Sequence, residues 1–317
     1  MSNVLNNINI SEYRNILNQE KEKLNVFLGE HGLKVFISLS VVFIFVIYFL
    51  FFYKRISRSL KRMEKRFRKY KNIIPLERKY DIFNKNYVLS DFYVASSYKC
   101  YLPCTNYIDY SSIKSIEAII KSGARFLDID IMNSDFQNCA EPVVCYGQEV
   151  GNWQYTNSLP LKEVLHTISL LAFSHHVENM TDPFYININF KTWYNKSTIN
   201  KTAEFIKTFF SGRLLSSEYS YQGRLSKVNI GTQPIKDFLA KLILVSPNNL
   251  KDTDMDELVN INTSSENLRT ETYNNVKDTA DPQELIEFNK KNFTMAIPPV
   301  KTREKKNQNF WTAYYFG

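Results

Sequence analysis

The sequence predicts an α/β domain preceded by a single transmembrane helix. The chain has 317 residues, 44% of them hydrophobic, which is enough to form the core of one domain of roughly 240 residues. Residues 35–53 contain no charged side chain, and residues 161–171 are typical of a helix within the domain that follows. The chain is rich in Asn, Lys, Ile and Tyr, which is typical of an AT-rich genome such as that of a protist or a large DNA virus.

Residues 1–34 are predicted to form an extramembrane segment with a surface helix over 11–30. Its apolar residues Tyr13, Leu17 and Leu24 lie near one helical face. We expect Gly29 and Gly32 to end this helix.

The apolar run at residues 35–53 is predicted to be the transmembrane helix. At a rise of about 1.5 Å per residue it nearly crosses a hydrocarbon core of about 30 Å. A signal peptide and a buried core helix are the alternatives. A signal peptide would begin near Met1 and end at small residues, whereas this run begins at residue 35 and is followed by Lys54 and Arg55.

The charges that flank the apolar run predict its orientation. Residues 54–71 carry ten Lys or Arg side chains and one acid, Glu64, whereas residues 1–34 carry four charges of each sign. By the positive-inside rule, the N-terminus lies outside and the C-terminal domain is cytosolic. The net charge of +8 therefore belongs to the segment that follows the membrane and not to the domain.

Residues 54–79 are predicted to form a basic cytosolic stalk. We expect its cations to lie on anionic lipid headgroups, and a solvated helix is the alternative. The apolar residues Ile56, Leu60, Met63, Phe67 and Tyr70 have heptad-like spacing, so a homodimer through the stalk is a further alternative. No nucleic-acid-binding fold accompanies the basic run, and we expect no nucleic-acid partner. The residues predicted at the membrane surface are Lys54, Arg55, Arg58, Lys61, Arg62, Lys65 and Arg66.

Four sequence fragments follow the stalk within about a hundred residues. They are Leu89-Ser-Asp-Phe-Tyr-Val-Ala-Ser-Ser-Tyr-Lys-Cys-Tyr-Leu102, Gly123-Ala-Arg-Phe-Leu-Asp-Ile-Asp130, Glu141-Pro-Val-Val-Cys-Tyr-Gly147 and Asp182-Pro-Phe-Tyr-Ile-Asn-Ile-Asn189. In this order and at these spacings they resemble the catalytic X region of the phosphoinositide-specific phospholipase C family. The resemblance implies a distorted TIM-type (β/α) barrel over residues 80–317, either complete or incomplete, with an X-like part at 80–215 and a weaker Y-like part at 225–317.

The same resemblance implies that the chemistry of the family has been replaced. Its two catalytic histidines correspond to Tyr98 and Tyr146, and its four calcium ligands correspond to Lys99, Asp128, Asp130 and Asn189. Tyrosine has a pKa near 10 and is a poor base at neutral pH. A lysine ammonium cannot ligate calcium, so we expect no metal cofactor, and we expect Lys99 to pair with Asp128 or Asp130. The positions that hold phosphate in the family correspond to Val245, Pro247 and Met295.

Histidines and cysteines elsewhere do not supply an obvious replacement. We expect no catalytic role for the histidines, which are His31, His166, His175 and His176. The cysteines are open to three interpretations, namely reduced buried thiols, a disulfide or a four-cysteine zinc site. They are Cys100, Cys104, Cys139 and Cys145. Residues 247–287, rich in Asn, Asp, Thr and Ser, are predicted to form long loops.

These observations favour a single-pass membrane protein whose phospholipase C-like domain no longer cleaves lipid. It would act as a scaffold or as a module that binds a membrane or an unidentified protein. The alternative is a diverged, metal-independent phosphodiesterase that uses Lys99 as its cation. A third hypothesis assigns the function to the basic stalk, with the barrel as a spacer.

Overall fold

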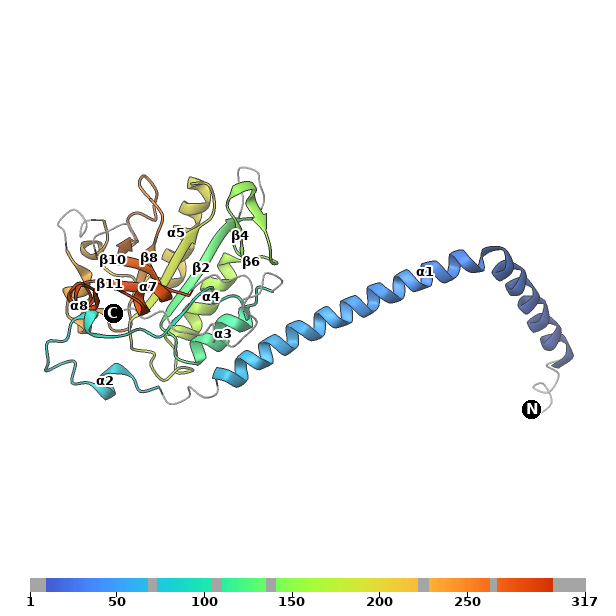
Figure 1. The fold of residues 1–317 in the computed structure, drawn as a ribbon, viewed down its shortest axis with the longest axis horizontal. Coiled ribbons are helices and arrows are strands. Elements are labelled where there is room, and N and C mark those ends of the chain that lie inside the picture. Colours follow the sequence, from blue (N-terminus) through green and yellow to red (C-terminus); the bar gives the residue numbers. More distant parts are fainter. Residues whose placement is uncertain are drawn as a thin grey trace, which may run out of the picture. The chain divides into compact units, whose positions relative to one another are not determined.

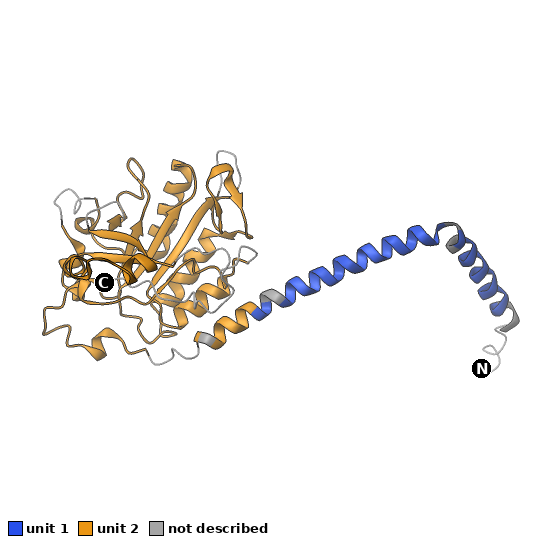
Figure 2. Cartoon of the chain, viewed as in Figure 1, with its two compact units in different colours: residues 1–58 blue, residues 59–317 orange. Residues whose placement is uncertain are grey.

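The computed structural model describes residues 10–67, 73–103, 110–134, 141–221, 228–262 and 267–298. The side chains of residues 10–12, 27, 28, 30, 55, 56 and 66 are not described. Cys104, Cys139, the closing residues 299–317 and the side chains of Arg55 and Arg66 therefore lie outside the described part. The chain divides into two compact units, residues 1–58 and 59–317 (Figure 2).

One continuous helix, α1 (Ile10–Phe67), occupies the N-terminal part of the chain (Figure 1). The prediction that Gly29 and Gly32 end a helix was wrong, because α1 passes through both positions. A helical glycine costs only about 1 kcal/mol relative to alanine, and the apolar run that follows propagates the helix. The segment His31–Lys65 is long and apolar enough to span a membrane, with a mean hydropathy of 2.9 in its most apolar stretch.

The last turns of α1 belong to the second unit. Met63 is buried and its sulfur accepts a hydrogen bond of 3.5 Å from the Ser115 hydroxyl of α3 (Ile113–Lys121). This apolar residue of the predicted stalk seam therefore packs within its own chain. A short helix, α2 (Leu76–Lys79), follows.

The second unit is built on a seven-stranded sheet with the order β6-β3-β2-β7-β8-β9, and β1 pairs with β2 beside that path (Figure 1). Parallel pairing joins β1 to β2, β2 to β7, β7 to β8 and β8 to β9, whereas β3 pairs antiparallel with β2 and β6. The strands are β1 (Ser96–Ser97), β2 (Phe126–Asn133), β3 (Pro142–Val144), β6 (Leu159–Pro160), β7 (Phe184–Phe190), β8 (Leu242–Ser246) and β9 (Ile261–Asn262).

Helices cover one face of this sheet. α3, α4 (Leu161–Ala172) and α5 (Lys196–Phe210) pack their apolar sides against alternate residues of the central strands. Leu127 and Ile129 of β2 and Ile186 of β7 face these helices. Because successive strand residues point to opposite faces, the residues between them face the other side.

The other face has an apolar half and a polar half. Phe126, Tyr185 and Ile243, near the starts of their strands, pack in a second core with Phe293 and Met295. Those two residues belong to β11 (Phe293–Ile297), which pairs in parallel with β10 (Leu268–Thr272). Helices α7 (Tyr273–Lys277) and α8 (Pro282–Asn289) connect these two strands.

The predicted α/β class is confirmed. Within the described residues, the strands form an open seven-stranded sheet, the parallel pair β10–β11 and an antiparallel pair of β4 (Gly147–Gln148) with β5 (Trp153–Gln154), and they do not form a closed ring. The prediction of long loops over 247–287 is confirmed for residues 247–260, which contain no helix or strand, and was wrong beyond them, because β9, β10, α7 and the start of α8 lie in that range. The polar composition there reflects half-exposed strands and short helices with side-chain caps. The Thr272 hydroxyl, for example, caps α7 by accepting a hydrogen bond from the backbone N–H of Asn275.

Candidate functional site

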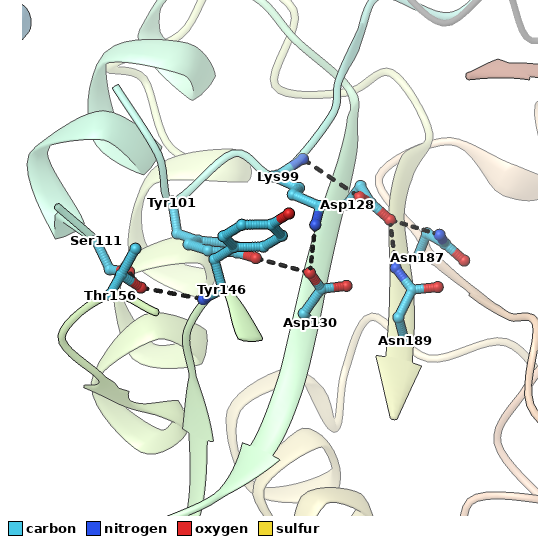
Figure 3. A network of polar contacts seen from close by, with 9 residues as sticks. All are labelled: Lys99, Tyr101, Ser111, Asp128, Asp130, Tyr146, Thr156, Asn187 and Asn189. Carbon is cyan, nitrogen blue, oxygen red and sulfur yellow. Dashed lines mark hydrogen bonds and ion pairs between the residues drawn. The ribbon is translucent and has the colours of Figure 1, made fainter. Parts of the chain in front are cut away.

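Polar side chains occupy the carboxyl halves of β2 and β7 on the face opposite the helices. Asp128 lies beside Asn187 and Asp130 beside Asn189 in the parallel register of the two strands. The two aspartates and Asn187 are buried. The carboxyl ends of parallel strands are where active sites of β/α barrels are found, so this is the candidate site (Figure 3).

Lys99 contacts both carboxylates from the turn that follows β1. Its backbone N–H donates to Asp128 Oδ2 at 3.2 Å, and its ammonium nitrogen lies 3.1 Å from Asp130 Oδ2 (Figure 3). The residue has a φ of 47°, in the left-handed region that side chains other than glycine rarely adopt. This backbone conformation presents the N–H and the ammonium of one residue to two neighbouring carboxylates.

Tyrosines surround the same ammonium. The nitrogen lies 3.8 Å from the centre of the Tyr146 ring and 5.3 Å from that of Tyr98. Aromatic faces attract cations at such distances. Tyr101 donates its hydroxyl to Asp130 Oδ2 at 2.8 Å, so this oxygen receives two donors. We call the group formed by Lys99, Tyr98, Tyr146, Asp128 and Asp130 the lysine cage.

Asp128 is held by amides. Its Oδ1 accepts from the side-chain amides of Asn187 at 2.6 Å and Asn189 at 2.7 Å. Burial, followed by the neighbouring Asp130 charge, raises the pKa of Asp128 to about 6, although the Asn187 amide and Lys99 oppose this shift. The Asn187 amide oxygen is buried and has no hydrogen-bond partner in the described structure.

Tyr146 is positioned by its backbone and by a ring contact. Its N–H donates to the Thr156 hydroxyl at 3.1 Å, and that hydroxyl shares a 2.8 Å hydrogen bond with Ser111. The Tyr155 ring lies edge-on, 5.6 Å away between centroids. Tyr146, which follows the carboxyl end of β3, is therefore held by contacts that do not involve Lys99.

Comparisons with known proteins identify the domain. Residues 85–247 match the family model of the phosphatidylinositol-specific phospholipase C X domain, over more than half of the chain. The chain belongs to this family. The 1-phosphatidylinositol 4,5-bisphosphate phosphodiesterase beta egl-8 of Caenorhabditis elegans is 25% identical over 163 residues, which cover 51% of this chain and 10% of that protein.

Two crystal structures are among the proteins similar to this chain. PLC21 of L. pealei superposes with a TM-score of 0.53 at 16% identity, covering 70% of this chain and 32% of that chain. PLC21 of S. officinalis gives a TM-score of 0.49 at 14% identity, with the same coverage. The L. pealei comparison shows a shared fold. The chain spans about a tenth of the curated relative and about a third of the two crystallised chains.

The phospholipase C family implies a calcium ion, and the residues present do not fit one. Two carboxylates and the Asn189 amide remain, and the amide nitrogen of Asn189 is directed at Asp128. Calcium takes six to eight oxygen ligands. Here an ammonium contacts Asp130, and no group of three or more His, Cys, Asp or Glu residues within the described ranges could hold a metal ion.

Two tyrosines of the site, Tyr98 and Tyr101, remain protonated at neutral pH. Burial and the charges of Asp128 and Asp130 raise the pKa of Tyr98 far above its usual value. Burial likewise raises the pKa of Tyr101, next to Asp130. These phenols can donate hydrogen bonds, but they supply no base near neutral pH.

The positions expected to contact phosphate are mostly apolar and buried. Val245 lies beside Asn187 in the sheet register and belongs to the second core, as does Met295. Pro247 is exposed just after β8. None of these three side chains can donate to a phosphate group.

Three of the histidines lie on or after α4 in the second unit, and one lies in the first unit. His166 is exposed on α4 with its ring 5.5 Å from Phe209, and His175 and His176 are exposed after that helix. His31 lies in α1, in the first unit. Their lack of a catalytic role stays a prediction.

The cysteines can be described in part. Cys100 and Cys145 are free and buried. Burial raises the pKa of Cys145 to about 12 and that of Cys100 well above its usual value, so both are thiols at neutral pH. No disulfide joins these two residues, while Cys104 and Cys139 lie outside the described residues.

Sequence analysis missed several residues of this site. Asn187 could have been found, because it lies two residues before Asn189 and therefore on the same strand face. Tyr101 lies in a turn without strand periodicity, so nothing in the sequence directs its hydroxyl to Asp130. Thr156 and Ser111 are far apart in sequence, and only the fold brings them to the Tyr146 backbone.

Proposed function

We propose that this chain is a membrane-anchored phospholipase C-like protein that does not cleave lipid and acts as a scaffold or a membrane-binding module. The observation that carries the proposal is the position of Lys99. Its ammonium contacts Asp130 and lies over the Tyr146 ring, at the edge of the sheet where the family's catalysis is expected.

The loss of proton-transfer groups supports the absence of turnover. Attack of a ring hydroxyl on a phosphodiester needs a base, an acid and a cation. General acid–base catalysis contributes about 10²–10⁴-fold per group, and Tyr98, which stays protonated at neutral pH, and Tyr146 take the places of the two histidines implied by the family resemblance. Val245 and Met295 are apolar at positions where the family resemblance implies side chains that contact phosphate, so these substrate contacts are missing as well.

The anchoring part of the proposal rests on α1. Its apolar stretch is followed by Lys54, Arg58, Lys61, Arg62 and Lys65, which favour an orientation with the phospholipase C-like unit in the cytosol. Basic residues next to a membrane contribute about 1 kcal/mol each to binding of anionic lipid. We infer a single-pass protein whose basic flank contacts such lipids.

Exposed aromatic side chains support a binding role for the second unit. Trp153, in β5 (Trp153–Gln154), and Trp193, just after β7, are 66% and 68% exposed. Glu149 joins their two loops, because its side-chain carboxylate accepts a hydrogen bond of 2.9 Å from the backbone N–H of Trp193. Trp and Tyr favour the interface between headgroups and acyl chains, so this pair fits a lipid surface.

The decisive experiment measures lipid cleavage by the full-length protein in lipid nanodiscs. Phosphatidylinositol and phosphatidylinositol 4,5-bisphosphate are supplied with and without calcium, beside a family member that retains both histidines. We expect no release of inositol phosphate from this chain under any of these conditions. Robust cleavage would overturn the proposal in favour of a metal-independent phosphodiesterase that uses Lys99 as its cation.

A further inference from the structure

The lysine cage has walls that do not depend on the lysine side chain. Asp128 and Asp130 come from β2, Tyr98 follows β1, and Tyr146 follows β3. Asn187 and Asn189 hold Asp128, Tyr101 holds Asp130, and Thr156 holds the backbone of Tyr146. Removal of the Lys99 side chain would therefore leave the walls and their supporting contacts in place.

These walls have the chemistry that recognises an ammonium ion. A carboxylate oxygen lies 3.1 Å from the nitrogen, and the centres of two tyrosine rings lie 3.8 and 5.3 Å from it. Ring faces attract ammonium ions but do not ligate hard metal ions, which need several oxygen ligands. The ammonium contacts Asp130, whereas Asp128 receives the backbone N–H of Lys99 and two side-chain amides.

We propose that the lysine cage is an ammonium-binding site that the chain fills with its own Lys99, and that it binds a free alkylammonium ion when this side chain is removed. Lys99 is then a tethered ligand. A lipid or other molecule with an ammonium group reaches the site only by displacing it.

Two features of Lys99 fit the role of a tethered ligand. Its backbone takes the left-handed conformation that brings both the N–H and the ammonium to the carboxylates. Its side chain is 17% exposed, whereas that of Asp130 is 4% exposed, so the cage opens to solvent along the lysine. A small ion can enter by the same path.

Lys99→Ala in the full-length protein provides the test. The substitution removes the side chain beyond Cβ, which corresponds to n-propylammonium, and engineered cavities of this kind bind molecules that match the missing group. Thermal unfolding in detergent is measured against added n-propylammonium chloride, n-propanol, sodium chloride and calcium chloride. We expect n-propylammonium alone to raise the Tm of Lys99→Ala, in a saturable manner.

Three controls separate this binding from general salt effects. The wild-type chain should not respond, because Lys99 fills the cage. Lys201→Ala removes the cation of an exposed ion pair with Glu141 and should not create a response. Lys99→Ala combined with Asp130→Asn should lose most of the response, because the ammonium then lacks its counter-ion.

The proposal is overturned if Lys99→Ala does not respond, if n-propanol or calcium stabilises it as strongly, or if the Asp130→Asn combination responds equally. If Lys99→Ala is too unstable to purify, the yield of folded protein after refolding with and without n-propylammonium replaces the Tm, and no gain in yield is a negative result. Because the readout is stability, the outcome is independent of whether the protein cleaves lipid.

Discussion

The ammonium nitrogen of Lys99 lies 3.8 Å from the centre of the Tyr146 ring. Tyr146 and Tyr98 stand where the family resemblance implies histidines, and Lys99 stands where it implies a calcium-binding asparagine. The replacements therefore contact one another, and a cation–π contact is worth about 0.5–2 kcal/mol depending on its exposure. A change at one of these positions alters the environment of the others, so they should behave as a coupled set.

The first prediction concerns stability. Lys99→Met keeps the length of the side chain but leaves Asp130 without its cation, and breaking a buried ion pair by removing one partner costs about 3–5 kcal/mol. We expect a loss of about 3 kcal/mol in the free energy of unfolding, measured with urea. Lys201→Met, in an exposed pair, should cost less than about 1 kcal/mol. Equal losses in the free energy of unfolding would show that the ion pair of the cage stabilises the protein no more than an exposed ion pair does.

The second prediction concerns pH. Asp128 has a pKa of about 6 in the folded protein, above the value of about 3.9 expected when it is unfolded. A raised pKa means that the folded state binds the proton more tightly than the unfolded state does. The stabilisation that proton binding at Asp128 gives the folded state is therefore present at low pH and is lost as the pH rises through about 6. When the pH is lowered from 7 to 5, the free energy of unfolding of the wild type should increase by about 1 kcal/mol relative to that of Asp128→Asn.

Unfolding of both proteins across this pH range checks the second prediction. Groups that titrate alike in both proteins cancel in the difference, so the difference reports Asp128 and the groups that it contacts. A pH-independent difference, or one that falls as the pH is lowered, would contradict the raised pKa.

The sequence predicted the α/β class and the family, and the structure also contains one contact of the site that the family resemblance implied. The family resemblance puts Lys99 at a calcium-ligand position and thereby implies its pairing with Asp128 or Asp130, and the structure divides these contacts between its ammonium and its backbone N–H. The left-handed backbone of Lys99 was not predictable, because it arises from tertiary contacts that outweigh the local preference. Local propensity likewise failed at Gly29 and Gly32, where the apolar run continues the helix.

The third prediction concerns topology. Protease added to sealed vesicles with the cytosolic face outward should digest the phospholipase C-like unit, because the positive-inside rule predicts that the basic flank of α1 places that end in the cytosol. Replacement of Lys54, Arg58, Lys61, Arg62 and Lys65 by glutamine should give a mixed orientation. Complete protection of the unmodified protein would contradict the predicted orientation.

The fourth prediction concerns the exposed tryptophans. The sequence has three tryptophans, so a Trp311→Phe protein retains only Trp153 and Trp193, which lie on the two loops joined by Glu149. Lipids brominated on their acyl chains should quench this fluorescence in nanodiscs, because the indole rings are expected at the membrane interface. Fluorescence that is unchanged by brominated lipid would remove this support for a membrane-binding surface.

The last prediction concerns catalysis. Tyr98→His and Tyr146→His together restore the imidazoles implied by the family, whose pKa near 6.5 suits both proton transfers. We nevertheless expect no recovery of phosphatidylinositol cleavage by the full-length variant, with or without calcium. Lys99 still contacts Asp130, and Val245 and Met295 still present apolar side chains where the family implies phosphate contacts.

A further substitution separates the two causes of this expected inactivity. Adding Lys99→Asn to the histidine pair removes the ammonium and returns an oxygen ligand, so calcium binding measured by calorimetry should increase before any activity appears. Activity of the histidine pair alone would show that the imidazoles were the single missing element and that the substrate-binding contacts had survived. Calcium binding without activity in the triple variant would assign the remaining defect to the apolar positions, since a metal and two imidazoles cannot position a phosphodiester that the pocket does not hold.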